Sequence, residues 1–532
     1  MKKVCVIGAG PAGIVMAKTL LEDGFDVSIL EQNDQVGGTF SDQGHYIGMH
    51  HQIDYGLFEF ADMPDRNDPG FGTAENKQKY FEAYAKKFKV WECLQLNTQV
   101  IGLQKENESW CIQTQPIQPK NALQTLHKQA EQHEIKTQIF DFVVIANGLH
   151  YLPYVPTVPN MNQFQGQVYH DNQIKDLKKL EGKQVIVVGG GKSAIDMSLL
   201  AGDTAQSTRL LFRKANWMIS HRHIGGLVPH RYVLYTRFME ALLPQYPNKH
   251  CVRLIDKIPK KIKKCLWRVI EWDVLFTSGM LGAPKAARPL GQLPHDLAVS
   301  GVWPKKYGPY LKQKKILPIC GEIAHFTEQG VVLASGEKLS ADVVIFATGH
   351  RKAYPYLDRS IKLQDHNGDF ELYRGLIPIG TENLAILGFR QIFNNLFSFE
   401  ISAHWVADYF QKRLPNFPSS EQMKQEITQR VAWMSHHFPN TRGFDWGPYN
   451  IHCIDELMLD MQLPCYRTNN WLSEYFAPGA NPKRYRNLAQ QRNLRDAGKI
   501  SSAKKSATWC YIGVVPSLLL SILLVTSLIL FK

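Results

Sequence analysis

A strand, a glycine-rich turn and a helix stand at the very start of the chain, and this unit constrains the fold more than any other feature. Residues 4–7 are apolar, residues 8–13 read Gly-Ala-Gly-Pro-Ala-Gly, and apolar side chains then recur at helical spacing until Gly24. The first glycine permits the tight turn, the second lets the backbone approach a pyrophosphate, and the third lets the helix pack on the strand. The spacing therefore predicts a dinucleotide-binding turn made by Gly8, Gly10, Pro11, Ala12 and Gly13.

An acidic residue follows at the position that such a unit uses for a ribose. A second predicted strand, residues 25–30, ends at Glu31, which lies 23 residues after Gly8. A carboxylate there accepts hydrogen bonds from the ribose hydroxyls. With strand, helix and acid in register, we predict dinucleotide binding. An ordinary tight turn between a strand and a helix is the alternative.

The same pattern returns at residues 184–212. Gly189, Gly191 and Ala194 keep the small-residue spacing, but the following strand ends in Arg213 and Lys214 and carries no acid there. Cations at this place suit a ribose 2′-phosphate, whereas an acid would suit unphosphorylated NAD. We therefore predict an NADPH site. The alternative is that the two cations are a solvated strand end.

Two further apolar strands, within residues 140–148 and 341–349, each end in a small-residue turn. Both are typical of buried parallel strands that deliver a loop to a ligand crevice at their carboxyl ends. Residues 115–138, rich in Gln, Lys and His, are predicted to be an exposed excursion. We expect an α/β fold with two Rossmann-like dinucleotide-binding domains.

The nine cysteines include no C-x-x-C pair, which excludes a dithiol redox centre. An FAD site together with an NADPH site indicates hydride transfer to a flavin. The function that remains is an enzyme that passes the electrons of the reduced flavin to oxygen or to another acceptor.

Several segments together resemble class B flavin monooxygenases. Residues 164–170 match the F-x-G-x-x-x-H signature of that family, and residues 346–350 are similar to its F-A-T-G-Y box. Residues 31–40 resemble its second flavin contact, and residues 387–405 its flavin-domain return helix. With an apolar C-terminal tail, the chain resembles in particular the membrane-attached flavin-containing monooxygenases of the dimethylaniline monooxygenase type.

The resemblance implies a reaction cycle and a set of site residues. NADPH reduces FAD, oxygen forms a C4a-hydroperoxyflavin, and a soft nucleophile, the N or S atom of a small amine or sulfide, takes the distal oxygen. The residues implied for FAD are Gly8, Gly10, Pro11, Ala12, Gly13, Glu31, Gly38, Thr39, Phe40 and Gln391. Those implied for NADPH are Gly189, Gly191, Ser193, Ala194, Arg213 and Lys214. His170 is either a cofactor contact or a structural histidine in the linker between the two domains.

Three positions depart from the family pattern, one of them Lys192, which replaces the usual asparagine of the second glycine turn. Ile174 stands where the signature usually ends in an aromatic residue, and Gln52 stands where the family has an asparagine that helps to hold NADP⁺ and the hydroperoxide. Glutamine keeps the amide but moves it by about 1.5 Å, which matters when placement governs the step. A Baeyer–Villiger oxygenase, an uncoupled NADPH oxidase and a non-catalytic, membrane-tethered flavoprotein therefore stay open.

The C-terminal part of the chain predicts a membrane address. Residues 509–531 contain no charged residue, and a helix of that length crosses a bilayer core of roughly 30 Å. The net charge of +13 equals the sum of +7 in residues 483–505 and +6 in residues 251–268. Residues 251–268 are predicted to be a basic amphipathic helix that is broken at Pro259. We read this charge as attraction to an anionic leaflet rather than to nucleic acid, with a cytoplasmic catalytic body. The membrane would be the endoplasmic reticulum in a eukaryote or the inner membrane in a bacterium.

The expected organisation has five parts, with the FAD domain interrupted by the NADPH domain. These are 1–155 (FAD domain, first part), 156–330 (NADPH domain), 331–440 (FAD domain, second part), 441–505 (extension with a basic juxtamembrane segment) and 509–531 (transmembrane anchor). The substrate and the oligomeric state are left open.

Overall fold

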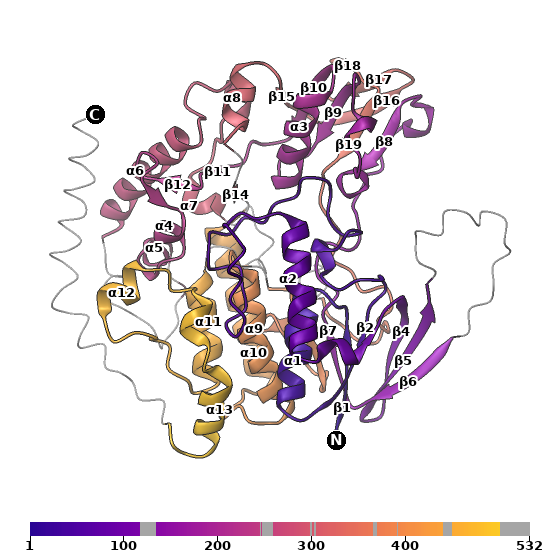
Figure 1. Ribbon diagram of the computed structural model, residues 1–532. Coiled ribbons are helices and arrows are strands. Elements are labelled where there is room, and N and C mark those ends of the chain that lie inside the picture. The colour runs from indigo at the N-terminus through magenta and orange to yellow at the C-terminus, as the bar shows by residue number, and fades with distance from the viewer. Residues whose placement is uncertain are drawn as a thin grey trace.

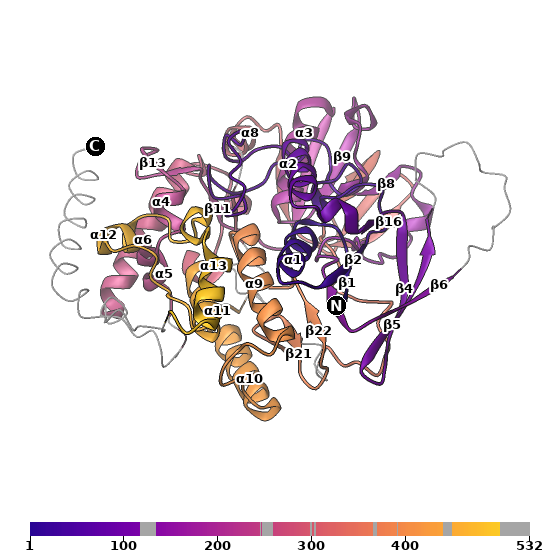
Figure 2. The ribbon, with the colours of Figure 1, turned by 60° about the horizontal axis from the view of Figure 1, so that its bottom comes forward.

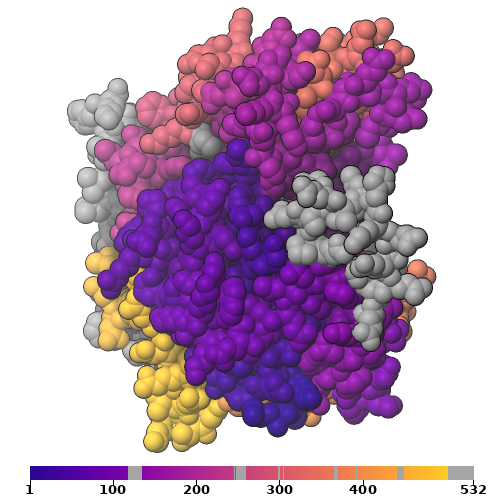
Figure 3. Space-filling model, turned by 45° about the vertical axis from the view of Figure 1, so that its right-hand side comes forward, coloured from indigo at the N-terminus to yellow at the C-terminus, as the bar shows by residue number. Residues whose placement is uncertain are grey.

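Two five-stranded parallel sheets form the body of the protein (Figure 1). The computed structural model describes residues 1–117, 135–244, 246, 259–297, 300–302, 305–364, 370–390, 392–439 and 449–500. Each sheet is built on one of the two strand–turn–helix units, so the fold is α/β with two Rossmann-like halves. Figure 3 shows these halves one above the other, with the N-terminal residues in the lower one.

The first sheet contains the chain's first strands and one late strand. Its order is β22 (Leu384–Ile386), β7 (Phe142–Ile145), β1 (Lys3–Ile7), β2 (Asp26–Leu30) and β3 (Leu94–Gln95). Helices α1 (Pro11–Glu22), α9 (Asn395–Phe410) and α11 (Asn450–Asp460) lie side by side, with α9 in the middle (Figure 2). Buried apolar strands covered by helices are what a parallel sheet requires.

The second sheet holds the second glycine-rich turn. Its order is β15 (Leu317–Cys320), β10 (Ser207–Phe212), β9 (Gln184–Val188), β19 (Val343–Phe346) and β8 (Gln167–His170). Helix α3 (Lys192–Thr204) follows β9, and α8 (Tyr307–Lys312) packs against α3.

One predicted boundary differs from this topology. Strand β19 pairs with β8 and β9, so residues 331–346 belong with the second sheet rather than with the returning FAD part. The chain returns to the first sheet only after Phe346 and reaches it at β22. The sequence places a buried strand here but does not say which sheet accepts it.

Two small antiparallel sheets flank the main ones. The first contains β4 (Thr98–Glu106), β5 (Ser109–Pro116) and β6 (Lys136–Phe140), and the second contains β16 (Ile323–Thr327), β17 (Gly330–Leu333) and β18 (Lys338–Ser340). The two ends of the predicted exposed excursion 115–138 therefore belong to strands β5 and β6. Residues 118–134 lie outside the described residues.

Further helices complete the fold. They are α4 (Arg231–Leu234), α5 (Arg237–Leu242), α6 (Lys260–Thr277), α7 (Leu293–Asp296), α10 (Ser420–His437), α12 (Trp471–Phe476) and α13 (Leu488–Asp496). Of these, α4, α5, α6, α7 and α12 lie on the side of the molecule shown at the left of Figure 1. Helix α2 (Ala74–Lys87) lies near α1. Of the predicted amphipathic segment 251–268, residues 260–268 form the start of α6, directly after Pro259, and residues 251–258 are outside the described part.

The predicted anchor 509–531 also lies outside the described residues. Among the helices that the structure describes, none is both long enough and apolar enough to cross a bilayer.

Part of the predicted juxtamembrane charge is internal, which corrects the interpretation of residues 483–505 as a basic segment facing a leaflet. The guanidinium of Arg492, which is 1% exposed, lies 2.6 Å from carboxylate oxygens of both Asp23 and Asp408. Arg495 lies 2.7 Å from Asp408, and Arg413 lies 2.5 Å from Asp23. Arg492 and Arg495 thus attach α13 to the ends of α1 and α9, and Arg413, which follows α9, pairs with the same Asp23. These partners are too distant in sequence for composition to reveal.

Candidate functional site

Both glycine-rich turns open into one cavity of about 1590 Å³, which residues of both sheets line. A pocket for one drug-sized ligand is roughly 300–1,000 Å³, so this cavity has room for more than one nucleotide. The predicted residues that line it are Gly8, Gly10, Pro11, Ala12, Glu31, Gly38, Thr39, Phe40, Gln52, Gly189, Gly191, Ser193, Arg213 and Lys214. Gly13, Ala194 and His170 do not line it, and Gln391 lies outside the described residues.

The first turn is packed so closely that only glycine fits at two of its positions. Gly8 has φ +106°, and a Cβ there would lie 2.7 Å from the carbonyl oxygen of Ala146. A Cβ on Gly13 would lie 1.9 Å from the carbonyl oxygen of Gly8. A Cβ on Gly10 would meet only the Cα of Gly38, at 3.6 Å, so this glycine leaves open the space that a pyrophosphate needs.

Glu31, which is 5% exposed, closes the turn from the end of β2. Its carboxylate accepts hydrogen bonds from the backbone N–H of Ala9 at 2.7 Å and of Asn33 at 2.8 Å. Burial raises the pKa of this carboxyl against the effect of these bonds. Because a carboxylate has about four acceptor positions, it can hold the turn and still accept ribose hydroxyls.

Residues 38–40 form a short 3₁₀ turn against the first glycine turn. A Cβ on Gly38 would lie 3.0 Å from the Cα of Gly10, and the N–H of Gly37 donates to the carbonyl of Ala9 at 2.9 Å. Two separate backbone segments thus form one cradle without side chains, which suits a pyrophosphate.

The second turn repeats this construction at the other end of the cavity. Gly189 has φ +146°, and a Cβ there would lie 2.3 Å from the carbonyl oxygen of Ala347. Gly191 has open space around its Cα, and the amide of Asn216 holds the turn by donating to the carbonyl of Gly190 at 2.8 Å. Ala146 follows β7 and Ala347 follows β19, and each places its carbonyl oxygen against the first glycine of one of the two turns.

The predicted cations follow the end of β10, and each has a counter-ion. Arg213 is exposed, and its Nε lies 3.7 Å from a carboxylate oxygen of Glu322, which also lines the cavity. Lys214 lies 3.3 Å from the buried carboxylate of Asp296. A 2′-phosphate beside Arg213 would therefore compete with Glu322, which follows the neighbouring strand β15.

His170 lies behind the cavity wall and not in it. Its Nε2 is 3.0 Å from the carbonyl oxygen of Gly349, and its Nδ1 is 2.7 Å from a carboxylate oxygen of Asp171. Burial opposes the charged form, but Asp171 outweighs burial and raises the pKa of the imidazole. This geometry favours the structural histidine of the two alternatives. Ile174 is likewise buried in the second core and does not line the cavity.

Gln52 lines the cavity on the loop that precedes α2. Its side-chain oxygen accepts the backbone N–H of Val302 at 2.8 Å, which leaves the amide N–H groups as its free donors. The neighbouring His51 stacks on Phe58 with a centroid distance of 4.6 Å.

A buried chain of an ammonium, a carboxylate and an imidazole holds this loop. The ammonium of Lys77, which is 0% exposed, lies 2.6 Å from Asp68, and Asp68 lies 3.1 Å from His51. Burial works against the charge of Asp68, but His51 and Lys77 outweigh it and lower the pKa of the carboxyl to about 2. The Lys77–Asp68–His51 chain thus fixes the position of Gln52.

We expect Asp68→Asn to lower the free energy of unfolding by about 3 kcal/mol, because it removes one partner of a buried ion pair. The native pKa of Asp68 lies below the unfolded value of about 3.9, so its contribution is complete above that pH and is lost as the pH falls toward 2. Urea unfolding at pH 7 and pH 3 checks both points. A variant with wild-type stability at pH 7 would contradict the role of Asp68.

Sequence reasoning missed several cavity residues. Glu322, Asn216, His150, His350, Phe393 and Asn395 line it. Burial lowers the pKa of His350 to about 4, helped by the neighbouring imidazoles of His150 and His170, so this side chain is neutral at pH 7. Three of them had a usable signal, because Glu322, His150 and His350 follow shortly after apolar strands, and the strands before His150 and His350 were expected to reach a ligand at their ends.

Comparison with known proteins agrees with this geometry. The profile of the family described as "Flavin-binding monooxygenase-like" matches residues 1–267 and 313–463. Rabbit "Dimethylaniline monooxygenase [N-oxide-forming] 2" is 28% identical over 482 residues, which are 86% of this chain and 82% of that protein. The fold resembles that of S-allyl-L-cysteine S-oxygenase from Allium sativum (TM-score 0.60, 16% identity, 94% of each chain). It also resembles open cyclohexanone monooxygenase (TM-score 0.60, 15% identity, 94% of this chain and 99% of that one).

The family match covers most of the chain and both glycine-rich turns. The chain therefore belongs to the flavin-binding monooxygenase-like family, and the predicted resemblance is confirmed. As a member of this family it is a flavin-dependent monooxygenase.

Proposed function

We propose that this flavin-binding monooxygenase transfers one oxygen atom of O₂ to the nitrogen or sulfur of a small, soft nucleophile at the expense of NADPH. The observation that carries the proposal is that two backbone cradles, at Gly8 and Gly189, open into one cavity. The described residues that line it include no cysteine, and we infer that hydride would pass directly from NADPH to FAD when both are bound. FAD, when bound, would supply the redox chemistry and carry oxygen as the C4a-hydroperoxide.

The residues of the chain bind, orient and keep water out. Gly8, Gly10 and the 38–40 turn would hold the FAD pyrophosphate, and Glu31 its ribose. Gly189, Gly191 and Ser193 would hold the NADPH pyrophosphate, and Arg213 its 2′-phosphate. Apolar side chains that line the same cavity as Gln52, among them Phe58, Phe393 and Phe399, would exclude water from the reacting end.

Gln52 would place its free amide N–H groups against the nicotinamide nucleotide and the oxygen. We expect Gln52→Leu to lower the ratio of product formed to NADPH consumed about tenfold, the effect of losing a hydrogen bond of about 1.4 kcal/mol. The measurement is oxygenated product and hydrogen peroxide per NADPH. Gln43→Leu is the matched control, because Gln43 also lines the cavity but its amide donates to Asp34. Equal coupling in wild type and Gln52→Leu would remove Gln52 from the proposal.

Two other enzyme activities are outcomes of the same measurement. Conversion of a cyclic ketone to a lactone, with no oxygenation of sulfides, would indicate a Baeyer–Villiger enzyme. Peroxide equal to the NADPH consumed would indicate an oxidase, and a flavin that NADPH does not reduce would indicate a non-catalytic flavoprotein.

We also propose that residues 509–531 anchor the enzyme in a membrane with the catalytic body on the cytoplasmic side. The support is the uncharged run of 23 residues and the cations Lys499, Lys504 and Lys505 before it. Vesicle flotation of the full-length chain tests this, since an anchored chain floats in high salt and an unanchored one does not.

A further inference from the structure

Helix α6 carries an unusual outer stripe. Lys261, Lys264, Cys265, Arg268, Trp272 and Phe276 are all exposed, and their spacing of three or four residues places them on one face of the helix. The opposite face packs inward, where Trp267 donates to the carbonyl of Leu242 at 3.1 Å and Lys263 donates to that of Ala241 at 2.7 Å. We call these six residues the α6 stripe.

The stripe has a basic end and an aromatic end. Lys261 and Lys264 stand at the N-terminus of α6, where the positive end of the helix dipole disfavours cations. Within the described part of the chain neither forms an ion pair. At the other end, Trp272 and Phe276 are 47% and 49% exposed and stack on each other at 5.5 Å. Of the three cations of the stripe, only Arg268 is paired among the described residues, with Glu271 at 2.9 Å. A binding role therefore explains the unpaired lysines and the exposed aromatic pair better than a role in stability.

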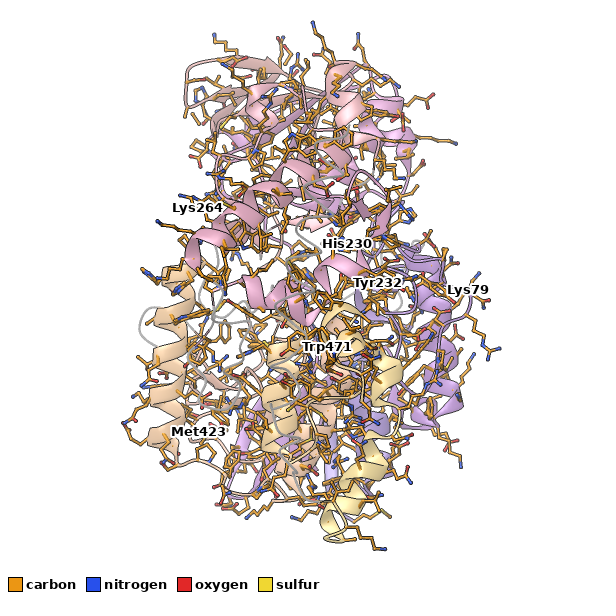
Figure 4. All side chains as sticks on the ribbon, turned by 90° about the vertical axis from the view of Figure 1, so that its left-hand side faces the viewer. Lys79, His230, Tyr232, Lys264, Met423 and Trp471 are labelled. Carbon is orange, nitrogen blue, oxygen red and sulfur yellow. The ribbon has the colours of Figure 1, made fainter. Side chains whose placement is uncertain are left out.

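Other exposed apolar side chains lie on the same side of the molecule as α6. Leu290, in the connection that follows α6, is 91% exposed, Tyr232 on α4 is 46% exposed, and Leu472 on α12 is 48% exposed. Figure 4 shows the side of the molecule on which α6, α4 and α12 lie together, with Lys264, Tyr232 and Trp471 labelled. Clusters of exposed apolar residues on one side are typical of interaction surfaces.

This surface is separate from the cofactor chemistry. The family profile matches residues 1–267 and 313–463, so Trp272, Phe276 and Leu290 fall in the interval that it leaves out. None of these three residues lines the nucleotide cavity.

We propose that the α6 stripe docks on the surface of a bilayer that contains anionic lipids. Lysine and arginine would contact the anionic headgroups, and Trp272 and Phe276 would enter the interface, where aromatic side chains are enriched. Charge complementarity selects this partner over a neutral apolar one. The docking rests on the proposed anchor only because the anchor delivers the chain to the bilayer. Docking of the α6 stripe would then hold the catalytic body in one orientation on the bilayer surface.

Two exposed cysteines make this testable in the full-length chain. Cys265 belongs to the α6 stripe, whereas Cys320 ends β15 on the second sheet. The chain is reconstituted into vesicles of about 30% phosphatidylglycerol in phosphatidylcholine, labelled with a membrane-impermeant maleimide, and read cysteine by cysteine by peptide mass spectrometry. We expect labelling of Cys265 to slow about tenfold relative to the chain in neutral detergent, and labelling of Cys320 to stay unchanged.

Variants separate the surface from the anchor. The triple variant Lys261→Gln/Lys264→Gln/Arg268→Gln and the variant Trp272→Ala/Phe276→Ala should each restore most of the Cys265 labelling. The matched control Lys105→Gln/Lys178→Gln/Lys338→Gln, which removes exposed cations elsewhere, should not. Flotation reports the anchor independently, so a chain that floats with Cys265 fully labelled overturns the docking surface alone. Protection of Cys265 in the absence of lipid would also overturn the proposal. If that protection depends on protein concentration, a second copy of the chain covers the α6 stripe; if it does not, the chain's own C-terminal segment covers it.

Discussion

Gly13→Ala should yield a protein that no longer retains FAD. The new Cβ would lie 1.9 Å from the carbonyl oxygen of Gly8, and this oxygen cannot move away. Gly8 is fixed because its own N–H donates to Leu30 at 2.8 Å and its Cα faces the backbone of Ala146. Helix α1 must therefore shift from β1, which displaces the N–H groups that would face the pyrophosphate.

We expect the ratio of bound flavin to protein to fall by more than about tenfold, and the free energy of unfolding of the apoprotein to fall by about 3 kcal/mol, as for an overpacked core position. Absorbance of the purified protein and denaturant unfolding measure the two quantities. Gly10→Ala is the matched control, since its Cβ would make only an ordinary contact at 3.6 Å, and we expect the apoprotein of this variant to keep its stability. Stoichiometric flavin in Gly13→Ala would show that the first turn is not the FAD cradle.

The second large effect is expected at the other cradle, for Arg213→Ala. A charge-assisted hydrogen bond to a phosphate contributes roughly 1.5–3 kcal/mol, so the KM for NADPH should rise by about 10- to 100-fold. The KM for NADH, which has no 2′-phosphate, should change little. Steady-state NADPH and NADH oxidation by the purified flavoprotein provides both values.

Two further variants sharpen this result. Arg209→Ala removes a cation from the same strand whose guanidinium instead donates to the carbonyl of Ser340, and it should leave both KM values unchanged. Glu322→Gln removes the carboxylate that lies 3.7 Å from Arg213, and it should lower the KM for NADPH. Equal changes for NADPH and NADH in Arg213→Ala would refute the 2′-phosphate role.

The parts of the molecule that could be predicted from the sequence are those whose partners are close along the chain. Gly8, Gly13 and Glu31 lie within one strand–helix–strand unit, so their spacing alone indicated the turn. The position of β19 could not be found in this way, because its neighbours β8 and β9 lie more than 150 residues earlier.

The charged residues show the same limit more clearly. The excess of cations in residues 483–505 suggested a surface, but Arg492 lies between Asp23 and Asp408, which are 469 and 84 residues away. The Lys77–Asp68–His51 chain behind Gln52 gave no signal either, since burial decides whether such groups pair and the sequence does not report burial. In α6 the prediction was right in part: the predicted basic amphipathic segment ended at residue 268, whereas the helix continues to Thr277, so Trp272 and Phe276 fell outside it.

Stopped-flow mixing of the NADPH-reduced enzyme with oxygen tests the proposed chemistry. We predict that NADPH bleaches the flavin without oxygen, and that oxygen then produces a flavin adduct that persists for seconds and decays at once when a sulfide or tertiary amine is added. One oxygenated product should form for each NADPH consumed. Reoxidation in a single fast phase with stoichiometric hydrogen peroxide, unaffected by the nucleophile, would contradict the proposal that this enzyme is an oxygenase of soft nucleophiles.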